Sequence, residues 1–290
     1  MNWRGMQDDE VEAHFNPRIA SRDAQGSLDR YAVRSAEARE KLAGTCIAAE
    51  NLRYGPEPKQ TYDLYRPTSG TGKRPLVVFI HGGYWRALDK SDHSFVVPPL
   101  VDAGAVVANL NYDLCPDVTL DEISAQVLAG VRHCHASAAE WGADPGHMVL
   151  IGHSAGAHLA ARVLNAPADD QGRPADLVHS VAAISGIYEP QIALRLAAVN
   201  DQAQITADAA ERNDCLKIPP GGSAKLIVWA GGDEPEGWID QSRQYADLAT
   251  GQGMDCTFFT LDGTDHFTVL ERSFETSSPG WRTIETLLGR

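Results

Sequence analysis

The sequence has no long hydrophobic run, no paired-cysteine motif and no apolar leader. Its longest apolar stretches, such as residues 76–80, have about five residues, whereas a helix needs ~20 to span a bilayer. The five cysteines are odd in number and scattered, which is typical of reduced thiols rather than of a disulfide framework. Residues 1–10 turn acidic where a secretory signal would require an apolar segment. We therefore expect a soluble, cytoplasmic protein.

Basic residues are also scarce. The chain has 25 Lys and Arg against 39 Asp and Glu, a formal net charge of −14. It offers no basic patch that could release counterions from nucleic acid or bind an anionic membrane, so we expect neither as a partner. No glycine-rich dinucleotide or phosphate loop follows a predicted strand, and we expect no cofactor. The expected partner is a small-molecule substrate, and the sequence is compatible with a homodimer without requiring one.

Short apolar runs alternate with helical segments along most of the 290 residues. The runs predict eight strands, at residues 45–52, 61–65, 75–80, 105–110, 148–151, 178–184, 225–230 and 256–261. Thr119-Leu-Asp-Glu122 is a capping box that predicts a helix to about residue 140. Further helices are predicted after Ser154 and over residues 238–250. The alternation favours an α/β fold with a mainly parallel eight-stranded sheet covered by helices on both faces.

No linker is long or polar enough to divide the chain, so residues 1–290 are interpreted as one domain. Within it, residues 1–44 are polar and helix-prone and form an N-terminal helical extension. Residues 186–222 interrupt the alternation with Ala- and Leu-rich sequence and a Pro-Pro-Gly-Gly turn. We interpret this segment as a small cap inserted between two strands.

A candidate nucleophile lies in Gly152-His-Ser154-Ala-Gly156, which follows one predicted strand and opens a helix. This is the G-x-S-x-G nucleophile elbow in its expected context. Glycines are needed because a Cβ two residues to either side of the serine would collide with neighbouring elements. The turn lifts the Ser154 hydroxyl clear of the sheet and aims the Ala155 N–H at the reacting oxygen.

A second motif, His81-Gly-Gly-Tyr-Trp85, follows the strand at residues 75–80. Two consecutive glycines leave the N–H groups of Gly82 and Gly83 unobstructed, so we expect them to complete an oxyanion hole with Ala155. The alternative for this segment on its own is a plain turn at the end of a strand.

Serine needs a base and an orienting acid, which follow the elbow in the order acid, then histidine. His266 lies in a polar loop after the last strand and is the expected base, whereas His179 begins an apolar strand. Asp233 stands at the end of the preceding strand and is the expected acid. Two alternatives stay open: Glu234, which is adjacent but expected to point the other way, and Asp240, expected on the following helix.

No metal site is expected. His133 and His135 resemble a metal tract, but residues two apart on a helix do not share a face. His153 and His158 adjoin the nucleophile and are interpreted as structural.

These motifs together resemble those of the α/β-hydrolases, in particular the arylformamidase (kynurenine formamidase)-like branch near the hormone-sensitive-lipase group. The similar stretches are Phe15-Asn-Pro-Arg18, Leu52-Arg-Tyr-Gly55, Asp63-Leu-Tyr-Arg-Pro67, Phe79-Ile-His-Gly-Gly-Tyr-Trp-Arg86, Asn111-Tyr-Asp-Leu114 with Pro116, Gly152-His-Ser-Ala-Gly156 and Asp265-His-Phe267. The resemblance implies the α/β-hydrolase fold and a triad of Ser154, Asp233 and His266. The chain departs from the family at Ala157, where glycine is frequent, and in a loop after Asp233 that is about one residue longer.

Three functions of different kinds are compatible with these residues. The first is hydrolysis of an N-formyl arylamine such as N-formylkynurenine, with Tyr84 and Trp85 at the pocket mouth stacking on the aromatic leaving group. The alternative enzyme is a carboxylesterase for short acyl esters. A non-catalytic binding module would require an incomplete triad, and this sequence has candidates for every member.

Overall fold

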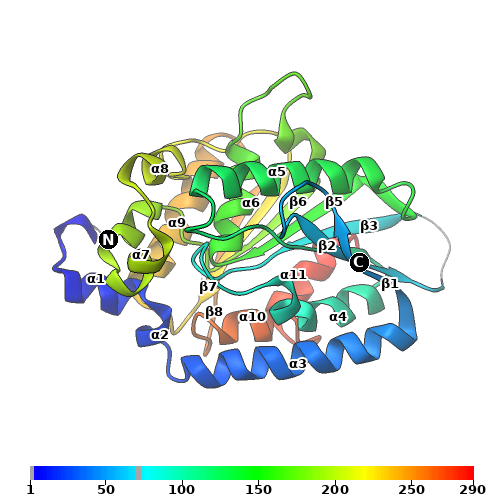
Figure 1. Cartoon of the computed structure of the whole chain (residues 1–290), viewed down its shortest axis with the longest axis horizontal. Coiled ribbons are helices and arrows are strands. Elements are labelled where there is room, and N and C mark those ends of the chain that lie inside the picture. Colours follow the sequence, from blue (N-terminus) through cyan, green and yellow to red (C-terminus); the bar gives the residue numbers. More distant parts are fainter. Residues whose placement is uncertain (1–2, 70–72) are drawn as a thin grey trace.

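An eight-stranded sheet forms the centre of the computed structural model, which describes residues 3–69 and 73–290 (Figure 1). The strands are β1 (Cys46–Arg53), β2 (Thr61–Pro67), β3 (Arg74–Ile80), β4 (Val106–Leu110), β5 (Ala143–His153), β6 (Ser180–Ile184), β7 (Lys225–Gly231) and β8 (Cys256–Leu261). Their order is β1-β2-β4-β3-β5-β6-β7-β8. The pairs β1–β2 and β2–β4 are antiparallel, and all the following pairs, from β4–β3 to β7–β8, are parallel. All eight predicted strands and the mainly parallel sheet are confirmed.

Helices cover both faces of this sheet, as predicted. One layer contains α5 (Leu120–Ser137), α6 (Ala155–Asn165) and α9 (Glu236–Gly251). The opposite layer contains α3 (Ala24–Thr45), α4 (Val97–Asp102), α10 (Thr268–Ser273) and α11 (Pro279–Leu287) (Figure 1). Alternate side chains of β3 enter different cores: Leu76 and Val78 pack toward the first layer, and Val77 and Phe79 toward the second. Burial on both faces explains why β3 is a continuous apolar run.

Short sequence motifs predict where a helix begins and ends to within a few residues, as α5 shows. The Thr119 side chain accepts the Glu122 N–H, and the Glu122 carboxylate accepts the Thr119 N–H at 2.7 Å, so the predicted capping box is present. Helix α5 ends at Ser137, three residues before the predicted end. The following turn closes at Gly142, whose φ of +79° lies in the left-handed region that favours glycine.

The N-terminal segment and the segment between β6 and β7 meet at one end of the molecule. The first contributes α1 (Asp8–Phe15) and α2 (Pro17–Ala20), and the second contributes the 3-10 helix η4 (Pro190–Arg195), α7 (Ala197–Ala203) and α8 (Ala207–Arg212) (Figure 1). The Trp3 indole N–H donates to Glu189 at 2.8 Å, and the Arg195 guanidinium donates to Asp8 at 2.6 Å. The two segments form one layer over the carboxyl ends of the parallel strands.

No helix within residues 3–69 and 73–290 combines the length and apolar character needed to cross a membrane.

A buried ion pair joins β2 to the 3-10 helix η2 (Lys90–Val96). Lys90 Nζ lies 2.8 Å from Asp63 Oδ1, and the two side chains are only 6% and 3% exposed. Asn51 completes the cluster, since its side chain accepts from Lys90 and its N–H donates to Asp63. Each charge is stable in the interior only because the other is present.

Lys90→Met should lower the free energy of unfolding by about 3–5 kcal/mol, because Asp63 would remain as an unpaired buried carboxylate. Urea denaturation measures the change. Lys41→Met is the matched control, since Lys41 is exposed and 3.5 Å from an exposed Asp102, and should cost less than about 1 kcal/mol. Adding Asp63→Asn to Lys90→Met should recover much of the loss. Equal losses for Lys90→Met and Lys41→Met would contradict the assigned role.

Candidate active site

Ser154 lies on the turn between β5 and α6, with φ 57° and ψ −121°. A Cβ on Gly152 would lie 2.3 Å from the Gly156 oxygen, and one on Gly156 would lie 2.0 Å from the Ile80 oxygen. Both positions therefore exclude any side chain, as the sequence motif predicts. The strained serine backbone is held in place by a 2.9 Å hydrogen bond from the Ser154 N–H to the Ile184 oxygen.

His266 contacts the Ser154 hydroxyl directly. Its Nε2 lies 3.0 Å from Ser154 Oγ, and its Nδ1 lies 2.6 Å from Glu234 Oε1. A carboxylate accepts only, so Nδ1 carries the proton and Nε2 is free to accept the serine proton. The Trp238 ring packs on the imidazole with centroids 4.3 Å apart, and His266 is 3% exposed. This hydrogen-bonded chain of three side chains is the arrangement that activates a serine hydroxyl.

The acid in this chain is Glu234, so the prediction that Asp233 would orient the histidine is wrong. Glu234 Oε2 also accepts from the Ser185 hydroxyl and from the Gly231 N–H, both at 2.6 Å. These three hydrogen bonds fix a carboxylate that is fully buried. Asp233 instead lies at the surface, with its carboxylate 3.2 Å from the Arg22 guanidinium.

A tight turn at the end of β7 explains the difference. The Glu234 N–H donates back to the Gly231 oxygen at 3.2 Å, so the chain reverses within four residues. The reversal directs Asp233 outward and returns Glu234 toward β6 and the histidine loop. Glycine at 231 permits this path, because a Cβ there would lie 2.4 Å from the Thr264 oxygen. In the sequence, the Gly-Gly pair at 231–232 is the feature that indicates such a turn. Asp240, the other alternative, lies on α9 and ion-pairs with Arg243.

The backbone of the Gly82–Gly83 loop lies against the nucleophile. A Cβ on Gly82 would approach the Ser154 Cβ to 3.0 Å, so only glycine allows this contact. Gly83 has φ +117°, and its oxygen accepts the N–H groups of Arg86 and Ala87, which closes the loop. Within the described chain, the N–H groups of Gly82, Gly83 and Ala155 have no hydrogen-bond acceptor. Three free donors beside the serine suit an oxyanion that forms during reaction.

Tyr84 and Trp85 have different environments. Tyr84 lines the pocket beside Ser154, and its hydroxyl donates to the Phe15 oxygen at 2.5 Å. Trp85 is fully buried, and its indole N–H donates to His158 Nδ1 at 3.2 Å. The prediction that Trp85 stands at the pocket mouth is therefore wrong. Positive φ angles at both residues turn the indole inward against α6.

The neighbouring histidines are neutral and structural. Burial lowers the pKa of His158 to about 3, which keeps its Nδ1 an acceptor for Trp85. Burial, with the nearby His266 imidazole, lowers the pKa of His153 well below its ordinary value. The His153 Nε2–H donates to the His266 oxygen at 2.8 Å and steadies the loop that carries the base. His133 contacts the Tyr62 hydroxyl. Among residues 3–69 and 73–290, no three His, Cys, Asp or Glu side chains are placed to hold a metal ion.

A cavity of about 610 Å³, including its mouth, opens above Ser154 and His266. The N-terminal segment forms a large part of its wall, which sequence reasoning missed. The residues that this segment contributes are Asn16, Pro17, Arg18, Leu28 and Tyr31. No periodicity or motif reports such a contact, because the N-terminal residues and the serine are more than 100 positions apart.

The sheet, the elbow and the Ser154–His266 contact define an α/β-hydrolase. The sequence is 30% identical over 283 residues to the kynurenine formamidase of Salmo salar, covering 93% of this chain and 92% of that protein. The chain therefore belongs to the kynurenine formamidase family and is a hydrolase.

Other comparisons agree with this class. The family described as BD-FAE matches residues 62–191. A crystal structure of a candidate thioesterase from Silicibacter sp. TM1040 is 29% identical, with a TM-score of 0.80 and coverage of 99% of this chain and 100% of that one. Esterase B of Lactobacillus rhamnosis, at 20% identity, a TM-score of 0.70 and 94% coverage of both chains, shares the fold.

Substitution of each carboxylate in turn tests whether Glu234 or Asp233 is the acid that orients His266. Glu234→Gln should lower kcat for p-nitrophenyl acetate by roughly 10³–10⁴, the scale found when the corresponding carboxylate of a serine protease is neutralised. Asp233→Asn makes the same chemical change one residue away and should cost less than about tenfold, because its carboxylate lies at the surface and pairs with Arg22. If Asp233→Asn lost most of its activity while Glu234→Gln stayed active, the assignment of Glu234 as the acid would be wrong.

Proposed function

We propose that this chain is a serine hydrolase whose catalytic triad is Ser154, His266 and Glu234, and that it acts through an acyl-enzyme. The observation that carries the proposal is the unbroken chain of hydrogen bonds from Ser154 Oγ through the imidazole to Glu234. Each bond has the direction that the chemistry needs, and all three side chains are buried.

In the first half-reaction, Ser154 Oγ attacks the substrate carbonyl carbon while His266 Nε2 takes its proton. The carbonyl oxygen becomes an oxyanion, which the N–H groups of Gly82, Gly83 and Ala155 stabilise. Collapse of this intermediate breaks the bond to the leaving group, and the imidazolium returns the proton to the departing atom. Glu234 stabilises the imidazolium and holds its tautomer.

Water completes the reaction. His266 removes a proton from a water molecule, whose oxygen attacks the acyl carbon bound to Ser154. The second oxyanion collapses, the ester bond breaks, and the proton passes to Ser154 Oγ. The enzyme is restored and the acid product, formate in the case of a formyl substrate, is released.

The substrate that we propose is an N-formyl arylamine such as N-formylkynurenine. Membership of the kynurenine formamidase family supports this choice. The cavity beside Ser154 also supports it. Aromatic side chains of Tyr31, Tyr84 and Phe267 line the same cavity and can pack on an aromatic leaving group.

Ser154→Ala should lower kcat by roughly 10⁴–10⁶, the loss found when a triad serine is removed. A fluorophosphonate should label the unmodified protein at Ser154, and intact-mass measurement should show one adduct. The Ser154→Ala protein should remain unlabelled. Retention of more than about a tenth of the activity would mean that another group is the nucleophile.

Acyl and leaving-group preference tests the substrate class. We expect kcat/KM for formanilide to exceed that for phenyl acetate, although the ester is intrinsically the more reactive compound. Formanilide should also exceed acetanilide by about tenfold or more, as expected of an enzyme whose proposed substrate carries a formyl group. Preference for phenyl acetate over formanilide would instead identify a carboxylesterase of short acyl esters, the alternative that the same triad would serve.

A further inference from the structure

A tyrosine of the N-terminal segment reaches the loop that carries the proposed base. Tyr31 lies on α3, and its hydroxyl donates to the Phe267 oxygen at 2.7 Å, one residue after His266. Burial raises the pKa of Tyr31 well above its ordinary value, so the hydroxyl keeps its proton and remains a donor. A buried hydrogen bond thus joins the N-terminal segment to the base loop across 236 positions of the sequence.

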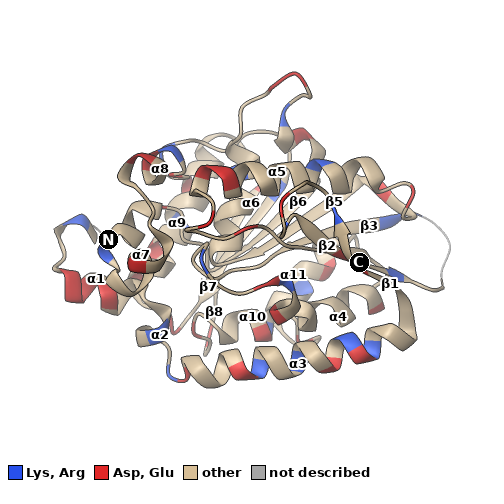
Figure 2. Ribbon diagram, in the orientation of Figure 1, with Lys and Arg blue, Asp and Glu red and all other residues tan. Residues whose placement is uncertain are grey.

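The surroundings of Tyr31 fix the place of its hydroxyl. The buried ring packs on Phe95 and His93, with centroids 4.7 Å and 5.6 Å apart. Charged residues of both signs occur along α3 (Figure 2). The buried residues of this helix recur every three or four positions and form one inward face, which consists of Ser27, Tyr31, Ser35, Ala38 and Leu42. The helix therefore presents the tyrosine to the interior in one orientation.

Two side chains from outside the base loop hold its backbone at consecutive residues. The His153 Nε2–H donates to the His266 oxygen at 2.8 Å, and the Tyr31 hydroxyl donates to the next oxygen along the chain. The first donor ends β5, immediately before the nucleophile, and the second comes from α3. Phe267 is also the residue that precedes α10, so the second bond fixes the start of that helix. Together the two bonds oppose rotation of the backbone that carries the imidazole.

The imidazole makes two contacts that depend on this backbone. Its Nε2 lies 3.0 Å from Ser154 Oγ, and its Nδ1 lies 2.6 Å from Glu234 Oε1. Displacement of a reacting group by about 1 Å can lower a rate by about a hundredfold. We propose that Tyr31 is a positioning residue for catalysis, whose hydroxyl holds the Phe267 backbone so that His266 keeps both contacts. This role rests on the triad of the proposed function.

Tyr31→Phe removes the hydroxyl and keeps the ring that lines the cavity. We expect kcat for p-nitrophenyl acetate to fall by about tenfold to a hundredfold because His266 is displaced, whereas KM should change by less than about threefold. Steady-state kinetics measures both constants. The Phe267 oxygen also accepts the Leu270 N–H at 3.1 Å, so the substitution does not leave this oxygen without a partner and the variant should fold.

Tyr245→Phe is the matched control. The buried Tyr245 hydroxyl donates to Asn165 Oδ1 at 2.9 Å, at the end of α6 farthest from Ser154. The control removes a hydrogen bond of the same kind without displacing the base, so kcat should fall by less than about twofold. Equal losses of kcat for the two variants, or a kcat for Tyr31→Phe within about twofold of the unmodified protein, would overturn the proposal.

A double variant tests whether Tyr31 acts through the histidine. In Glu234→Gln the imidazole has already lost the carboxylate that orients it, so a further loss of position has less effect. In that background Tyr31→Phe should lower kcat by less than about threefold, because two residues that act through one group are not additive. If Tyr31→Phe caused the same loss in both backgrounds, Tyr31 would act independently of the His266–Glu234 pair and the proposal would be wrong.

Proton NMR provides a readout that does not depend on turnover. The proton in the short bond between His266 Nδ1 and Glu234 should resonate far downfield and be absent in Glu234→Gln. In Tyr31→Phe this signal should shift upfield or be lost to exchange with water, and in Tyr245→Phe it should stay unchanged. An unchanged signal in Tyr31→Phe would contradict the positioning role.

The same measurements distinguish failure of this proposal from failure of the proposed function. If Ser154→Ala keeps its activity, the proposed function fails, yet the dependence of the downfield signal on Tyr31 can still be observed. If Ser154→Ala is inactive while Tyr31→Phe retains full kcat and an unchanged signal, the triad stands and the role of Tyr31 fails.

Discussion

The close contact between α6 and β3 is the constraint on which the active site depends. At Gly156 the helix backbone approaches the Ile80 and His81 oxygens so closely that no side chain fits between them. This contact determines where the helix begins, and therefore where Ser154 stands and where the Gly82 loop meets it. The strained backbone at Ser154 costs about 1–3 kcal/mol, which the packing of α6 and the hydrogen bond to Ile184 must offset. A looser contact would let the serine relax and move the free N–H groups away from it.

The histidine and its acid are positioned by a different part of the sheet. His266 follows β8 and Glu234 follows β7, and the two loops are tied together because the Asp233 N–H donates to the Thr264 oxygen at 2.9 Å. His153 connects this pair to the elbow by donating to the His266 oxygen. Base, acid and nucleophile thus follow the strands β8, β7 and β5; β7 and β8 are neighbours, and β6 separates β7 from β5. These strands are parallel, so their carboxyl ends face the same side. A rigid sheet therefore preserves distances that mobile loops alone would not.

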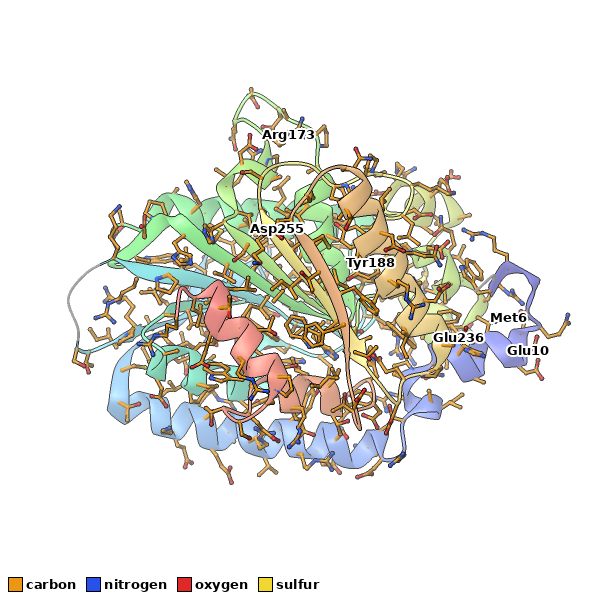
Figure 3. The ribbon with its side chains drawn as sticks, turned by 180° about the vertical axis from the view of Figure 1, so that it is seen from behind. Met6, Glu10, Arg173, Tyr188, Glu236 and Asp255 are labelled. Atoms are coloured by element: carbon orange, nitrogen blue, oxygen red, sulfur yellow. The ribbon has the colours of Figure 1, made fainter. Side chains whose placement is uncertain are left out.

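The layer above the site is built from two segments that are far apart in the sequence. Phe15 packs against Gly237 at the start of α9 and the Tyr84 hydroxyl bonds to the Phe15 oxygen. Figure 3 shows Glu236 close to α1, while Tyr188 lies in the interior beside α9 and stacks on Tyr245 at 4.4 Å. Because α1 and α2 contribute both to this layer and to the cavity wall, packing of the N-terminal segment and the shape of the substrate site are coupled.

The sequence alone determined the fold class, the eight strands and the serine, because apolar periodicity and glycine spacing are local patterns with direct structural causes. It also placed His266, the last histidine of the chain, in a polar loop after the last strand. Tertiary structure decided between Asp233 and Glu234, since one turn reverses which of two adjacent carboxylates faces inward. It also buried Trp85 and brought Arg18 to the cavity. The last two outcomes depend on contacts between residues distant in the chain, and no local pattern in the sequence records such contacts.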